Sequence, residues 1–191
     1  MNELNLSPTK TALVAIDLQN MVVSRATQPH DARSVVEQTA QLATALRAKG
    51  GFIVWVRVAG SDDGKDRLHP VCDQPWPPPR ELPPDANEYV SALPIRPSDH
   101  LITKRQWGAF CGTDLDLQLR RRGLTTIVLT GIATNIGVES TARAAFELGY
   151  EQIFVEDAMS ALSAAQHEHT ITHIFPRMGR VRCTADMLAA F

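Results

Sequence analysis

Charged or polar side chains follow three apolar runs that are predicted to be buried strands. Asp17 follows "TALVAI", Lys104 ends "HLITK", and the loop "GIATNIG" follows "TTIVLT". A carboxylate at the end of an apolar run costs much free energy to bury unless it is paired or functional. If Asp17 and Lys104 converge, the ammonium favours the charged carboxylate while burial raises its pKa, which is the arrangement of a general acid–base site. The alternative is that Asp17 caps a loop and that Lys104 ends its strand in solvent.

The third of these features, the loop "GIATNIG", leads into a helix predicted at about 136–149, with Thr134 or Asn135 as its N-cap. Gly137 lies in the first turn of this helix. A glycine there has a structural explanation, because it permits another part of the backbone to approach closely. It also suits a binding loop, because a helix N-terminus favours an anionic group. Both explanations stay open for Gly137.

The elements that must position these residues alternate along the chain. Apolar runs predict strands at 11–17, 52–58, 100–104, 125–131, 151–157 and 179–183. Helical spacing predicts helices within 31–51, 114–123, 136–149 and 163–178. We therefore expect a single domain, residues 1–191, with an α/β fold in which helices cover both faces of a six-stranded, mainly parallel sheet. Ligands of such folds bind beyond the carboxyl ends of the strands, where the three polar features lie.

Residues 60–98 interrupt this alternation and hold most of the prolines, including "PWPPPRELPP". Proline rings are incompatible with a helix interior and with a central strand, so the segment is expected to be irregular. Because regular alternation resumes directly after it, we expect a wall or lid over a site rather than a linker.

Composition argues against several classes of partner. The net charge of −2 gives no electrostatic reason to expect nucleic acid or an anionic membrane. No stretch approaches the roughly 18 apolar residues of a membrane span, and the N-terminus lacks the apolar region of a secretory signal. The three cysteines, Cys72, Cys111 and Cys183, are widely spaced and predict no disulfide framework. We therefore expect a cytoplasmic protein with no nucleic-acid or membrane partner.

Three segments, "ALVAIDLQN", "ITKRQWGAFCGTDLD" and "IVLTGIATNIGVESTARAAFELGY", resemble the signature segments of the isochorismatase-like hydrolases. The resemblance covers essentially the whole chain. It implies a three-layer α/β/α, Rossmann-like fold and a catalytic set of aspartate, lysine and cysteine. Asp17 matches the aspartate and Lys104 the lysine, whereas the cysteine position is Gly137. The resemblance also implies a cis peptide bond, Ile132–Ala133, that would aim the amides of Ala133 and Gly137 at one point as an oxyanion hole.

Glycine cannot form a thioester, so the resemblance does not extend to covalent amidase chemistry at Gly137. Some true isochorismatases also carry glycine at this position; they hydrolyse a vinyl ether with the aspartate as acid and water as nucleophile. Their loop resembles "GVYAH", whereas this chain has "GIATN", so the substrate stays open. We expect water-based hydrolysis of a small molecule by Asp17 and Lys104. The alternative is a catalytically silent binding protein on the same scaffold. Cys111, near the Lys104 loop, is a weaker substitute nucleophile.

The remaining expectations concern the pocket, metals and assembly. His167, His169 and His173 have the spacing H-x-H-x₃-H, but we expect a solvated helix face there, and no metal or cofactor. Homo-oligomers, dimers or tetramers, are usual for the family that the chain resembles, and apolar helix faces such as "VESTARAAF" fit this. The following residues are expected to line the pocket: Gln19, Trp76, Trp107, Phe110 and Asn135.

Overall fold

A computed structural model describes residues 4, 6–74 and 82–191, and its centre is a six-stranded sheet. All neighbouring strands pair in parallel, in the order β3-β2-β1-β4-β5-β6. The strands are β1 (Thr11–Ile16), β2 (Phe52–Val58), β3 (His100–Lys104), β4 (Thr126–Ile132), β5 (Glu151–Ser160) and β6 (Arg180–Arg182). Each predicted strand corresponds to one of these, so the predicted α/β fold is confirmed.

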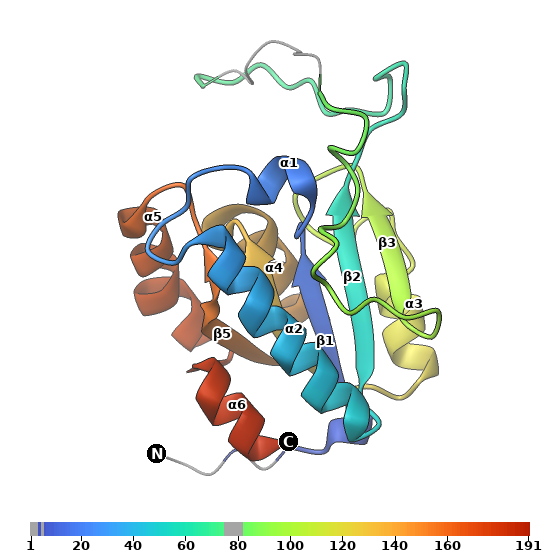
Figure 1. The fold of residues 1–191 in the computed structure, drawn as a ribbon, viewed down its shortest axis with the longest axis vertical. Coiled ribbons are helices and arrows are strands. Elements are labelled where there is room, and N and C mark those ends of the chain that lie inside the picture. Colours follow the sequence, from blue (N-terminus) through green and yellow to red (C-terminus); the bar gives the residue numbers. More distant parts are fainter. Residues whose placement is uncertain (1–3, 5, 75–81) are drawn as a thin grey trace.

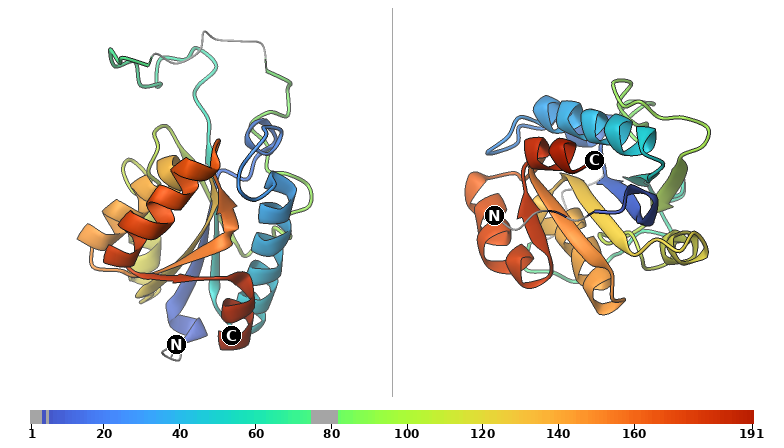
Figure 2. Two further views of the ribbon diagram at one scale, coloured as in Figure 1. Left: turned by 90° about the vertical axis from the view of Figure 1, so that its left-hand side faces the viewer. Right: turned by 90° about the horizontal axis from the view of Figure 1, so that it is seen from below.

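Helices cover both faces of the sheet, which gives three layers (Figure 1; Figure 2, left). The helices are α1 (Asn20–Val23), α2 (Ala32–Ala48), α3 (Leu115–Arg121), α4 (Glu139–Glu147), α5 (Ala164–His169) and α6 (Thr184–Ala190). Buried side chains of α2 and α6 form one apolar cluster with the sheet, while those of α3 and α4 form the other. Across the described residues, no helix is long and apolar enough to cross a membrane.

The direction in which strands are added to the sheet reverses between β1 and β4. The chain adds β2 and β3 on one side of β1, and later β5 and β6 on the far side of β4. The carboxyl ends of β1 and β4 approach closely, with Ile16 opposite Gly131. Gly131 has φ 119°, and a Cβ there would lie 2.1 Å from the backbone oxygen of Ile16. Only glycine fits this crossing point, which is where open α/β sheets bind ligands.

The helices differ from the predictions at four places. Short α1 and the C-terminal α6 were not predicted, and the first turns before α4 form a π-helix, η2 (Thr134–Val138). The helix predicted at 163–178 is instead α5, a π-helix η3 (Thr170–Ile174) and a 3₁₀ turn η4 (Phe175–Arg177). Pro176 lies in the 3₁₀ turn, beyond which regular helix does not continue, because proline cannot donate a backbone hydrogen bond.

The segment predicted as a wall or lid behaves differently in its two described parts. Residues 61–74 stand away from the body beyond the carboxyl ends of the strands (Figure 1). Residues 82–98 return along the body, where the amides of Asn20 and Met21 donate to the backbone oxygens of Glu88 and Ala86. The returning part therefore forms a wall beside α1. In the part 61–74, the Asp66 carboxylate accepts a hydrogen bond from Arg105, the residue after Lys104, and a cover over the sheet edge there stays a prediction.

Gly131→Ala tests whether the close approach of β1 and β4 is essential for the fold. The methyl group would overlap the backbone of Ile16, so we expect a loss of about 3 kcal/mol or more in the free energy of unfolding, measured by urea denaturation. Gly149→Ala is the matched control, because Gly149 has φ 81° but nothing within 4 Å of an added Cβ. Its backbone strain alone should cost about 1 kcal/mol. Equal losses in the two variants would contradict the steric argument.

Candidate functional site

Asp17 and Lys104 form a buried ion pair at the carboxyl ends of β1 and β3. The Lys104 Nζ atom lies 2.8 Å from Asp17 Oδ2, and the two residues are 2% and 6% exposed. Strand β2 lies between their strands, so the two side chains together bridge two strand spacings, about 9.6 Å. The lysine also donates to the backbone oxygens of Gln106, at 3.2 Å, and Trp107, at 2.6 Å. All three ammonium hydrogens thus have partners, and the predicted convergence of the pair is present in the structure.

The aspartate is less completely satisfied than the lysine. Its Oδ1 atom is buried without a hydrogen-bond partner among the described residues. Burial raises the pKa of Asp17 to about 6, against the charge and the hydrogen bond of Lys104, which both lower it. Asp17 also has φ 56°, a left-handed conformation that turns the chain sharply after β1. A carboxyl group with such a pKa exchanges protons near neutral pH, as acid–base catalysis requires.

Gly137 is the third residue of this site. A Cβ built on it would lie 3.1 Å from Asp17 Oδ2, 3.4 Å from Lys104 Nζ and 3.0 Å from a side-chain carbon of Ile16. The backbone of η2 therefore lies directly against the ion pair, and the space beside Gly137 is too small for a side chain unless its neighbours shift. The Ile132–Ala133 peptide bond before η2 is cis, as expected. The sequence-predicted triad Asp17, Lys104 and Gly137 is thus one spatial group.

Two threonines hold the loop that carries Gly137. The Thr141 hydroxyl donates to the backbone oxygen of Gly137, at 2.7 Å, and accepts from the amide of Ala109 in the Lys104 loop, at 3.1 Å. The Thr134 side chain is not the N-cap that was predicted; its hydroxyl bonds Nδ1 of His167, at 2.8 Å. Both threonines therefore help to hold this loop, in contacts that sequence analysis did not predict.

The residues predicted to line the pocket have different environments. Gln19 is fully buried, and its amide group exchanges two hydrogen bonds with the backbone of Val58, which favours a structural role. Phe110 packs in the core against Tyr150, whereas Trp107 is half exposed beside the Lys104 loop. Trp76 lies outside the described residues. Only Asn135 presents an unsatisfied group, because its Oδ1 atom is buried without a partner in the described part of the chain.

Tyr89, from the returning segment 82–98, is a neighbour of the site that sequence analysis did not single out. Its hydroxyl donates to the backbone oxygens of Trp55 and Ile102. Burial, with the charge of Asp17 adding to it, raises the pKa of this hydroxyl above its ordinary value. Tyr89 is therefore a neutral part of the wall near the carboxylate. Cys111, by contrast, is exposed, which argues against its service as a nucleophile for the buried pair.

A cleft of about 350 Å³ opens between α1 and the returning segment. The residues that line it are Asn20, Met21, Ser24, Leu82, Pro83, Asp85 and Ala86. Neither Asp17 nor Lys104 is among them, although α1 begins three residues after Asp17. The residues that line this cleft include no acid–base pair, unlike the Asp17–Lys104 site.

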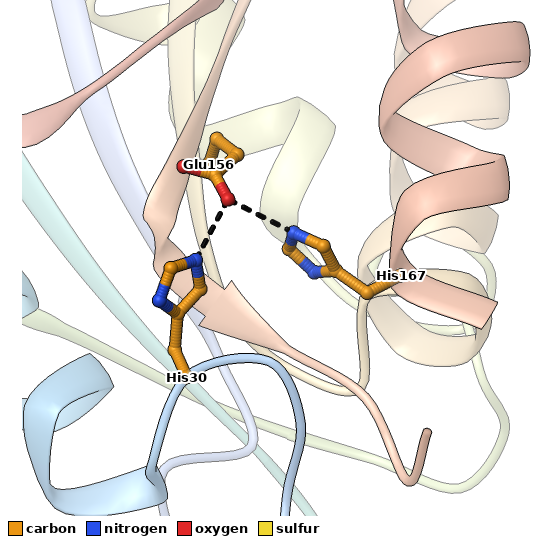
Figure 3. A group of neighbouring side chains, drawn as sticks. All are labelled: His30, Glu156 and His167. Atoms are coloured by element: carbon orange, nitrogen blue, oxygen red, sulfur yellow. Dashed lines mark hydrogen bonds and ion pairs between the residues drawn. The ribbon is translucent and has the colours of Figure 1, made fainter. Parts of the chain in front are cut away.

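A second polar cluster joins three distant segments (Figure 3). Glu156 Oε1 lies 2.7 Å from His30 Nε2 and 3.3 Å from His167 Nε2. The hydrogen bond from His167 is the main cause that lowers the pKa of Glu156 to about 2, helped by His30 against the cost of burial. His167 is buried, so the expectation that all three neighbouring histidines face solvent is wrong for it; His169 and His173 are exposed. Among the described residues, His30, Glu156 and His167 form a group that could hold a metal ion.

Comparisons with known proteins agree with this fold and these motifs. Residues 11–186 match the isochorismatase domain. The chain is 53% identical to an uncharacterised isochorismatase family protein, YwoC, of Bacillus subtilis (strain 168), over 98% of this chain and 97% of that protein. It is 50% identical to the uncharacterised isochorismatase family protein YecD of Escherichia coli O157:H7, over 98% and 99%.

Solved structures give the same result. An isochorismatase family protein from Burkholderia thailandensis superimposes with a TM-score of 0.93 at 48% identity, covering 97% of each chain. N-carbamoylsarcosine amidase from Thermoplasma acidophilum shares the fold, with a TM-score of 0.73 at 24% identity over 92% of this chain and 96% of that one. Together, the three-layer sheet, the matched domain and these relatives show that the chain belongs to the isochorismatase family.

Proposed function

We propose that this protein is a hydrolase of a small molecule in which water, rather than a protein thiol, is the nucleophile. The observation that carries the proposal is the contact of Gly137 with the Asp17–Lys104 pair. Asp17 and Lys104, which match the family's acid–base residues, are in contact with each other, and Gly137 beside them has no side chain. Hydrolysis of an enol ether fits this set, because it needs an acid and a water but no covalent intermediate.

In this mechanism Asp17 is the proton donor. With a pKa of about 6, about a tenth of the carboxyl groups are protonated at pH 7. The proton adds to the terminal carbon of the enol ether double bond, which leaves a cation shared by the adjacent carbon and oxygen. Water adds to that carbon and loses a proton, which returns to Asp17. The resulting hemiketal then splits into a ketone and an alcohol, so that one water is consumed for each enol ether.

Lys104 would act through electrostatics rather than by transferring a proton. Its three hydrogens are directed at Asp17 and at two backbone oxygens, which fixes the position of the carboxyl group. The unpartnered Asp17 Oδ1 and Asn135 Oδ1 atoms are acceptors that a polar substrate would satisfy. We propose that the amides of Ala133 and Gly137 receive a negatively charged oxygen of the substrate, such as a carboxylate.

The alternative function is binding without turnover. It is favoured by the same glycine, because this chain lacks the nucleophile of the cysteine-dependent members, and by the two buried acceptors. Native mass spectrometry of the purified protein separates the alternatives. A retained small molecule that is recovered unchanged supports binding alone, whereas its conversion supports the hydrolase.

We also propose that the protein is cytoplasmic and forms a homo-oligomer, a dimer or a tetramer. The exposed apolar side chains Phe146 and Leu148 near the end of α4 support an interface on that face. Light scattering of the purified protein measures its oligomeric state directly.

Asp17→Asn tests the proton donor. We expect the turnover of enol ethers to fall by about 10²–10⁴-fold, because an amide cannot supply the proton. The measurement is kcat/KM on a panel of enol ethers, with Asp62→Asn, a change at an exposed residue, as the control. Turnover unaffected by the Asp17 change would remove this residue from the mechanism.

The pH dependence tests which form of Asp17 is active. If the protonated form reacts, the rate falls about tenfold per pH unit above pH 6, the pKa of Asp17. Lys104 lowers this pKa, so Lys104→Met should move the falling limb to higher pH, in a pH–rate profile of each protein. A rate that instead rises through pH 6 would show that Asp17 acts as a base.

Gly137→Ala tests the space beside the ion pair. The methyl group would lie 3.1 Å from Asp17 Oδ2, so the carboxyl group must shift by a few tenths of an ångström. We expect kcat/KM to fall by about tenfold or more, because acid–base groups depend on such distances. Gly108→Ala is the matched control, since its added Cβ would make only ordinary contacts of 3.4–3.6 Å. Similar activity in both variants would speak against a catalytic role of this position.

A further inference from the structure

The cluster of His30, Glu156 and His167 is built from three parts of the chain (Figure 3). His30 precedes α2 and follows the cis peptide bond Gln28–Pro29, Glu156 is in β5, and His167 is in α5. The Nε2 atoms of both imidazoles point at one oxygen of Glu156 (Figure 3), and one ligand atom from each of the three residues lies within 4.8 Å of the other two. None of the proposed catalytic steps uses these groups.

We propose that this cluster is a binding site for a divalent transition-metal ion of the zinc class, with His30 Nε2, His167 Nε2 and a Glu156 oxygen as its ligands. Two imidazoles and one carboxylate are a ligand set that such ions take in proteins. Ligand atoms of a tetrahedral zinc ion are about 3.3 Å apart when each bond is about 2.05 Å long. The His167–Glu156 distance is already 3.3 Å, and the His30–Glu156 distance of 2.7 Å must open by a side-chain movement.

The surroundings of His167 suit a metal ligand. Its other ring nitrogen, Nδ1, lies 2.8 Å from the hydroxyl of Thr134, and the ring is 3% exposed. Metal-bound histidines nearly always have their second nitrogen fixed in this way. In the tautomer whose Nε2–H donates to Glu156, the Thr134 hydroxyl donates to Nδ1. When a cation binds Nε2, the ring hydrogen moves to Nδ1, and Thr134 becomes the acceptor.

The other two ligands leave room for further coordination. The side chains of His30 and Glu156 are 28% and 34% exposed, so solvent reaches the cluster from their side. A zinc ion held by three protein ligands keeps a fourth position for water or a small solute. The site would also fasten the loop that carries His30, together with α5, to β5. Through Thr134 it would contact η2, which holds Gly137.

The test measures metal binding alone, so its result is independent of the proposed hydrolysis. The full-length protein is treated with a chelator, dialysed and titrated with Zn²⁺ by isothermal calorimetry. We expect one equivalent to bind, and His30→Ala and Glu156→Gln each to weaken binding by at least about 100-fold. His169→Ala is the matched control, because the exposed His169–His173 pair is the other nearby place where zinc could bind. This control should bind as the unaltered protein does.

A spectroscopic measurement supports the titration without any variant. Co²⁺ bound by this ligand set should give the visible absorption of a four- or five-coordinate ion, and Zn²⁺ should displace it. If the unaltered protein takes up neither ion, the proposal is overturned, and the cluster is a hydrogen-bond network only. The proposal also fails if His169→Ala abolishes binding, or if binding survives in both His30→Ala and Glu156→Gln.

Discussion

The buried ion pair of Asp17 and Lys104 constrains the structure around it. Removing each ion of the Asp17–Lys104 pair from water costs several kcal/mol, which the mutual attraction offsets only when the geometry is good and the remaining hydrogen bonds are made. The structure meets this condition for Lys104 but not for Asp17, whose second oxygen has no partner among the described residues. The raised pKa of Asp17 follows from this imbalance, since burial outweighs the single ammonium. Because burial outweighs the ammonium, the Asp17 carboxyl group exchanges its proton near neutral pH.

The small residues around the pair follow from the same constraint. β1 is flanked by β2 and β4, so the carboxyl end of β1 is crowded from both sides. Gly131 lets β4 pass the oxygen of Ile16, and Gly137 lets η2 pass the carboxylate of Asp17. Gly137 therefore allows the loop backbone itself to lie against the ion pair.

Much of this arrangement is predictable from the sequence, for physical reasons. Buried parallel strands must be apolar along their whole length, so "TALVAI" and "TIVLT" are visible as runs, and their ends mark one edge of the sheet. Asp17 and Lys104 could be placed at that edge by this rule alone. The hydrogen bonds of Glu156 with His30 and His167, and of Thr134 with His167, could not, because they join residues up to 126 positions apart and leave no local pattern. The path of residues 61–74 could not be predicted either, because prolines exclude helix and strand but do not fix the direction in which a segment runs.

The loop that carries Gly137 is held from two sides with different access to solvent. On one side it meets the buried ion pair; on the other, Thr134 joins it to His167 and so to the half-exposed Glu156 and His30. In the proposed metal site, a cation on His167 Nε2 would reverse the hydrogen bond between Thr134 and His167. Thr134 directly follows the cis peptide bond and begins η2, three residues before Gly137. The chemistry of a buried carboxylate is thereby linked to groups that the solvent can reach without exposing the carboxylate itself.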